Sequence, residues 1–163
     1  MIFRQMFDSV SGTYSYLLAS RHGGEALIID PVLEKVERYI KLLSELDLRL
    51  VKAVDTHLHA DHITGLGALR DRTHCITVMG EQSKVDVVSM RVADGDQVRV
   101  EGISLQAIYT PGHTDDHICV VCENHVITGD VKNVHTVLRP GGRVLVRRSP
   151  YRACGLARPR QPG

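Results

Sequence analysis

The sequence predicts a single α/β domain, in which short strands alternate with a few helices. Three observations lead to this prediction. The chain has 163 residues, enough for one domain with a moderate core. Short apolar runs rich in β-branched residues recur along it, and amphipathic helical segments separate some of them. Its hydrophobic content of 43% and charged content of 24% are those of an ordinary globular protein.

The first expected elements are two strands and a helix. Residues 13–19 and 25–30 are apolar runs separated by a Gly-Gly turn signal, which predicts a hairpin. Asp30 and Pro31 then have the pattern of an N-cap followed by proline in the first helical turn. Apolar residues at helical spacing predict an amphipathic helix over residues 32–48.

The following elements alternate in the same way, and no internal repeat occurs. We expect a short helix at 63–70, a turn at 94–96, and strands at 50–57, 73–80, 103–110, 117–124 and 125–130. Beyond these residues the pattern decays, and 144–146 is the one remaining strand candidate.

The composition excludes several classes of protein. No apolar run approaches the roughly 20 residues that cross a bilayer. Arg4 and Asp8 interrupt the N-terminal segment where a signal peptide needs an unbroken apolar stretch. We therefore expect a cytoplasmic protein, or a matrix protein if it belongs to an organelle, without a membrane partner.

Two of the four cysteines, Cys119 and Cys122, form a C-x-x-C pattern that a redox site could use. They lie inside a β-rich apolar run with no helix start behind it. The favoured interpretation is therefore two strand residues without redox chemistry.

Charge is distributed unevenly along the chain. Residues 131–163 hold eight of the twenty Lys and Arg residues and no acidic residue, whereas residues 1–130 carry a net charge of −7. A basic tail can bind nucleic acid. Tyr151 is its only aromatic residue, however, and it contains no nucleic-acid-binding motif. We therefore expect a poorly ordered tail and no nucleic-acid partner.

A cluster of potential metal ligands follows the strand expected at 50–57. The segment HLHADH contains His57, His59, Asp61 and His62. In an extended segment His57 and His59 point the same way and can reach one ion, and Asp61 and His62 approach it from another side where the chain turns. Imidazole and carboxylate groups are ligands of zinc and of non-haem iron. A purely structural role is disfavoured, because three crowded imidazoles repel one another as they protonate.

His113 and Asp130 extend the candidate site. Each follows an apolar strand, in the segments TPGH and TGD, where Gly112 and Gly129 permit tight turns. Strand-end loops commonly carry the active sites of α/β proteins, so we expect these residues to converge on one edge. The remaining histidines receive no functional role (His22, His74, His125, His135), and His117 is expected to be structural or exposed.

The segment HLHADH resembles the H-x-H-x-D-H signature of the metallo-β-lactamase superfamily. The segments GTYSYLLA, LIIDPVLE, AVDTHLHADHITG, TPGHT and ITGD, together with the D-G-D turn, resemble the persulfide dioxygenases, a glyoxalase II-like branch. The resemblance covers about residues 3–130. It implies an αββα sandwich formed by residues 1–130.

The resemblance also implies a site and a reaction. One Fe²⁺ per chain would be held by His57, His113 and Asp130, a 2-His-1-carboxylate triad. His59, Asp61 and His62 would orient these ligands from outside, with Asp61 as a catalytic residue, or would bind metal directly if it is Zn²⁺. The implied reaction, part of sulfur metabolism, oxidises glutathione persulfide with O₂ to sulfite and glutathione.

The sequence departs from the family pattern after Asp130. The segment TVLRPGGR is similar to the segment that the family has here, but the sequence then diverges, as a reading-frame change near residue 138 would produce. A late histidine ligand of the family is missing. We therefore expect 131–163 to be a divergent tail and the C-terminal half of the sandwich to be incomplete. Weak or absent turnover, exposed apolar surface on the strands at 103–110 and 125–128, marginal stability, and homodimers or aggregates would follow.

Two alternative functions stay open. The first is a dinuclear zinc hydrolase of the glyoxalase II type, in which a metal-activated hydroxide attacks a glutathione thioester. The second is a non-catalytic metal-binding remnant whose basic tail binds acidic partners. One bound iron would favour the dioxygenase, and two bound zinc ions would favour the hydrolase.

Overall fold

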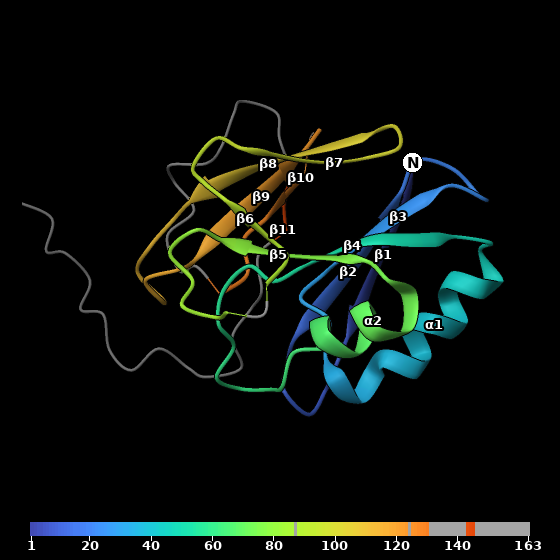
Figure 1. Cartoon of the computed structure of the whole chain (residues 1–163), viewed down its shortest axis with the longest axis horizontal. Coiled ribbons are helices and arrows are strands. Elements are labelled where there is room, and N and C mark those ends of the chain that lie inside the picture. The colour runs from blue at the N-terminus through green and yellow to red at the C-terminus, as the bar shows by residue number, and fades with distance from the viewer. Residues whose placement is uncertain (87, 124, 131–142, 146–163) are drawn as a thin grey trace, which may run out of the picture.

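The computed structural model describes residues 1–86, 88–123, 125–130 and 143–145, which form two facing β-sheets with helices on one side (Figure 1). The first sheet has the strand order β1-β2-β3-β4-β5-β6. Its strands are β1 (Ile2–Phe7), β2 (Tyr14–Ala19), β3 (Glu25–Ile29), β4 (Arg49–Val54), β5 (Ile76–Gly80) and β6 (Met90–Val92). The pairs from β1 to β3 are antiparallel, and those from β3 to β6 are parallel.

The second sheet has the order β11-β10-β9-β8-β7. Its strands are β7 (Gln97–Val100), β8 (Ile103–Tyr109), β9 (Ile118–Cys122), β10 (His125–Ile127) and β11 (Arg143–Leu145). Neighbours from β7 to β10 are antiparallel, whereas β11 runs parallel to β10. The strand candidate at 144–146 is therefore confirmed for its first two residues, and residue 146 lies outside the described part of the chain.

The main core lies between the sheets. Leu18, Leu27 and Val54 of the first sheet and Leu105 and Ile127 of the second belong to one cluster of buried side chains. The alternate residues of the first sheet form a second cluster with α1 (Val36–Glu45) and α2 (Leu66–Thr73). Because the central strands are covered on both faces, their sequences are almost continuously apolar rather than alternating.

The α/β sandwich expected from the sequence is confirmed in this arrangement. Figure 1 shows α1 and α2 together on the first sheet, on the side away from the second sheet. Within the residues that the structure describes, no helix covers the second sheet. The described chain thus contains the inner two layers of the sandwich and one of its helical layers.

The expected N-cap at Asp30 is wrong. A 3₁₀ turn, η1 (Leu33–Lys35), precedes α1, and the residue before it, Val32, makes no side-chain capping bond. Asp30 itself has a left-handed φ of 49°, and its carboxylate accepts a hydrogen bond from Thr56, as described below. The Asp-Pro pair therefore ends β3 and turns the chain toward the site instead of starting a helix.

The other elements differ from the predictions mainly at their ends. The expected strand at 50–57 stops at Val54, and the helix expected at 63–70 is α2, at Leu66–Thr73. Strand β1 was not expected, because its polar residues face outward at the edge of the sheet. The turn at 94–96 is confirmed, with Gly95 at a φ of 86° between β6 and β7.

The expected apolar surface on the strands at 103–110 and 125–128 is absent from the described residues. Leu105 and Ile127 are fully buried between the sheets, and Val126 packs with Cys119 on the opposite face. The large exposed apolar residues of the described chain lie elsewhere. Cys119 and Cys122 are confirmed as buried strand residues, and burial raises the pKa of both thiols.

Candidate metal centre

The loop between β4 and α2 carries the histidine cluster, and a buried carboxylate fixes its start. The Thr56 N–H donates to Asp30 Oδ1 at 2.7 Å, and the Thr56 hydroxyl donates to Asp30 Oδ2 at 3.0 Å. The Leu58 N–H donates to Asp116 Oδ2 at 3.1 Å. These bonds tie the loop to the end of β3 and to the segment before β9, so that His57 is held from both sheets.

His57, His113 and Asp130 form the first donor set. Each offers one ligand atom, and the three atoms all lie within 4.8 Å of one another. His113 Nε2 lies 3.6 Å from Asp130 Oδ2. His57 Nδ1 lies 2.9 Å from the Thr56 hydroxyl, which leaves Nε2 as the ring nitrogen available to an ion. The three come from the ends of β4, β8 and β10, as the convergence argument expected.

Burial keeps the His57 ring in the neutral form that can bind a metal. Loss of solvent, followed by the positive charge of His59, lowers its pKa from 6.5 to about 4. The ring is therefore neutral at neutral pH, as a metal ligand must be. The side chain of His113 is 37% exposed and that of Asp130 is 20% exposed, so the set opens to solvent on their side.

His59, Asp61 and His62 form the second donor set, again with ligand atoms within 4.8 Å of one another. His62 Nδ1 lies 3.2 Å from Asp61 Oδ1 and 3.2 Å from the hydroxyl of Thr13, and the same hydroxyl donates to Asp61 Oδ2 at 3.3 Å. Thr13 directly precedes β2, so the loop between β1 and β2 supports this set through hydrogen bonds. His59 Nδ1 and His62 Nε2 are buried without a hydrogen-bond partner among the described residues. Two such ring nitrogens fit a second metal position.

His59 connects this set to two buried carboxylates. Its Nε2 lies 3.2 Å from Asp30 Oδ1 and 3.8 Å from Asp55 Oδ1. Burial opposes a charge on this ring, but Asp30, Asp55 and Asp61 outweigh burial and raise its pKa to about 9. Burial also raises the pKa of Asp55 to about 7. In the metal-free protein the proton on His59 Nε2 therefore faces Asp30 and the proton on Nδ1 faces Asp61, so an ion in the second set would replace the Nδ1 proton.

The sequence argument that His57 and His59 point the same way is wrong in its reason. The strand ends before both residues, so a period of two does not apply. Their rings lie 4.2 Å apart, but their ligand atoms fall into different donor sets. The loop conformation set by Asp30, rather than strand alternation, decides which nitrogen each ring presents.

His117 was not recognised from the sequence as part of the site. It is fully buried, its ring stacks on His57 with centroids 5.0 Å apart, and its Nδ1 lies 2.9 Å from the Thr110 hydroxyl. Burial lowers its pKa to about 4. A neutral His117 therefore packs behind His57 and fixes the plane of that ring. Its position four residues after His113, directly before β9, was the available signal.

Gly129 permits the close packing beneath these rings. Its φ is 51°, and a Cβ there would lie 2.5 Å from Thr56 Oγ1 and 2.9 Å from His117 Nε2. Both the left-handed backbone and the lack of space therefore require glycine. Asp130 follows directly, so this turn sets where its carboxylate lies.

Comparison with known proteins agrees with this arrangement. A family model described as the metallo-beta-lactamase superfamily matches residues 8–153. The chain belongs to the metallo-beta-lactamase superfamily. The matched segment continues past Asp130 into residues that the sequence analysis assigned to a divergent tail, most of which lie outside the described part of the chain.

Two kinds of enzyme occur among the relatives. The human mitochondrial persulfide dioxygenase ETHE1 is 43% identical over 133 residues, which cover 80% of this chain and 52% of that protein. A hydroxyacylglutathione hydrolase from Pseudoalteromonas translucida is 30% identical over 131 residues, which cover 80% of this chain and 50% of that protein. The chain therefore spans about half the length of these relatives.

A solved structure gives the same similarity in three dimensions. ETHE1 from Myxococcus xanthus superposes with a TM-score of 0.75 at 47% sequence identity, and the match covers 77% of this chain and 56% of that one. The described part of the chain contains no helix that is both long and apolar enough to span a membrane.

Proposed function

We propose that this chain carries the mononuclear iron centre of a persulfide dioxygenase, with His57, His113 and Asp130 as the ligands. The observation that supports this most directly is the first donor set, in which two imidazoles and one carboxylate meet with an open side. A 2-His-1-carboxylate triad with open positions is characteristic of non-haem iron oxygenases. The human and Myxococcus xanthus relatives, both named ETHE1, support the same assignment.

The surrounding residues would keep the ligands in the correct form. Thr56 holds Nδ1 of His57, so that Nε2 faces the ion, and Asp30 holds Thr56 in turn. His117 stacks on His57 and limits the rotation of its ring. When bound, iron would supply the redox chemistry by which O₂ oxidises a persulfide sulfur. The protein's part is to keep His57 neutral and to hold the three ligands oriented and accessible from the side of His113 and Asp130.

Asp61, His59 and His62 would act next to the iron rather than on it. Asp61 lies within reach of both imidazoles and is about one third exposed, so it can meet a substrate. We propose that its carboxylate orients the substrate or accepts a proton during turnover. The substrate would be glutathione persulfide, and the products sulfite and glutathione.

The second donor set supports one alternative, a dinuclear zinc hydrolase. His59 Nδ1, Asp61 and His62 Nε2 could hold a second ion, and the hydroxyacylglutathione hydrolases are relatives at about 30% identity. In that case a metal-activated hydroxide would attack a glutathione thioester.

Two assays distinguish these functions. The iron-loaded chain is given glutathione persulfide while O₂ uptake and sulfite are measured, and the zinc-loaded chain is given a glutathione thioester while free thiol is measured. Persulfide-dependent O₂ uptake that His113→Ala abolishes supports the dioxygenase. Thioester hydrolysis by the zinc form, without O₂ uptake by the iron form, would overturn it.

A further inference from the structure

A pocket of about 370 Å³ lies behind the metal-binding loop, between that loop, α2 and β5. Its walls are mainly apolar and include Leu58, Leu66, Met79, Val85 and Val88. Pockets of this size hold small molecules. His59 and His62 of the second donor set line part of it, whereas the proposed reaction approaches the metal from the side of His113 and Asp130.

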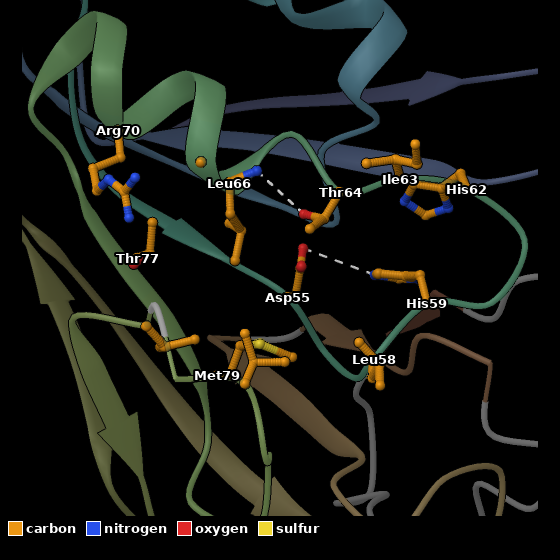
Figure 2. Close-up of a pocket in the computed structure, with 13 residues that line it drawn as sticks. Asp55, Leu58, His59, His62, Ile63, Thr64, Leu66, Arg70, Thr77 and Met79 are labelled. Carbon is orange, nitrogen blue, oxygen red and sulfur yellow. Dashed lines mark hydrogen bonds and ion pairs between the residues drawn. The ribbon is translucent and has the colours of Figure 1, made fainter.

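One buried carboxylate interrupts this apolar lining. The side chain of Asp55 is only 2% exposed, and its Oδ1 has no hydrogen-bond partner among the described residues. Figure 2 shows the carboxylate in the middle of the pocket, between Leu66, Thr64 and His59. A buried carboxylate oxygen without a donor is costly, so a ligand that supplies a donor would bind there favourably.

The neighbouring groups satisfy Asp55 only in part, because the Thr64 side chain donates to its carboxylate but Oδ1 has only a long contact with His59. His59 Nε2 lies 3.8 Å away and is nearer to Asp30 Oδ1, at 3.2 Å. Arg70 also lines the pocket, and its guanidinium donates to Asp71 at 3.0 Å. Asp30 and Asp55 thus share one nearby histidine, so the surroundings of Asp55 Oδ1 are suited to a cation.

We propose that this pocket binds a small aliphatic amine in its protonated form. The ammonium group donates to Asp55 Oδ1, and the hydrocarbon chain lies against Leu66, Met79 and Val88. Because His59 and His62 also line the pocket, a bound amine contacts the metal-binding loop from behind. Binding of the amine requires neither iron nor turnover.

Gly67 offers a way to close the pocket without disturbing the site. It lies in α2 and lines the pocket, and a Cβ at this position would have no atom within 4 Å. Gly67→Phe therefore directs a ring into open space. Gly67→Ala is the matched control, since it changes helix propensity in the same direction but fills little of the volume.

The test measures binding of hexylamine, hexan-1-ol and hexanoate to the full chain at about pH 8, where Asp55 is mostly ionised and the amine is protonated, by calorimetry and by NMR shift changes. We expect one saturable site for hexylamine, with binding at least tenfold weaker for hexanoate. Gly67→Phe should weaken hexylamine binding at least tenfold, whereas Gly67→Ala should change it less than twofold. Asp55→Asn should remove the preference for hexylamine over hexan-1-ol.

Two outcomes would overturn the proposal. Hexylamine binding that Gly67→Phe leaves unchanged would place the amine elsewhere, for instance at the metal centre. Equal binding of hexylamine and hexanoate by the wild-type chain would show that Asp55 does not select a cation. If Asp55→Asn fails to fold, Gly67→Phe still tests the proposal. Both variants are judged by amine binding alone, so the result is independent of O₂ uptake.

Discussion

Asp30 organises the site although it is absent from the first donor set. Its carboxylate accepts hydrogen bonds from the Thr56 N–H and hydroxyl, and it faces His59 Nε2 at 3.2 Å. Its sequence context predicts a helix cap, because an Asp-Pro pair is common there. The left-handed φ of Asp30, which no local pattern predicts, turns its side chain to the loop instead.

Asp30→Asn should weaken iron binding about 10- to 100-fold, because it removes the charge that orients Thr56 and His59. Asp47→Asn is the matched control, since Asp47 also has a left-handed φ, of 53°, but is exposed and remote from the loop. Competition with a chromogenic chelator measures the affinity. Equal affinities for the two variants would show that Asp30 does not support the site.

His117 makes the iron-free protein sensitive to acid. Its pKa is about 4 in the folded chain and 6.5 in the unfolded chain, so the unfolded state binds the extra proton first. Its contribution to stability is therefore complete above pH 6.5 and is lost as the pH falls toward 4, by roughly 2–3 kcal/mol. Denaturant unfolding at pH 6.5 and 4 should show a smaller loss for His117→Gln than for wild type. Replacing the exposed His22 by Gln should leave the wild-type loss unchanged, and a full loss in His117→Gln would contradict the assignment.

The turn after β10 sets the position of Asp130. Gly129→Ala should be destabilised by the left-handed φ, about 1–2 kcal/mol, and further by contact with Thr56 and His117. Gly95→Ala is the matched control, because Gly95 also has a positive φ but open space around its Cβ position. We expect Gly95→Ala to keep its iron and Gly129→Ala to lose most of it. Metal analysis with thermal unfolding checks this, and full iron content in Gly129→Ala would refute the packing argument.

Most elements were predictable because their strands are apolar runs and α1 is amphipathic. The ends of the elements were less predictable. Strand β4 stops at Val54, although Asp55 and Thr56 still look like strand residues in sequence and make backbone hydrogen bonds to Val78 and Ile118. The candidate ligands were found from their spacing and residue types. Asp30, Thr13 and His117 were missed, because their contacts join residues far apart in sequence.

At the scale of the whole molecule, two sheets bring the ends of β4, β8 and β10 to one edge. Each donor of the first set comes from a different segment, so the set forms only when both sheets are folded and packed. The second set, in contrast, lies within one loop and is braced by Thr13. The iron content therefore tests both the packing of the two sheets and the assignment of the three ligands.

The most direct measurement is the metal content of the full chain after anaerobic loading with iron and, separately, with zinc. The account predicts about one iron per chain in the wild type and in His22→Ala, and almost none in His113→Ala. Equal iron in His113→Ala and the wild type would contradict the ligand assignment. Two tightly bound zinc ions per chain, with no stable iron, would contradict the mononuclear iron centre itself.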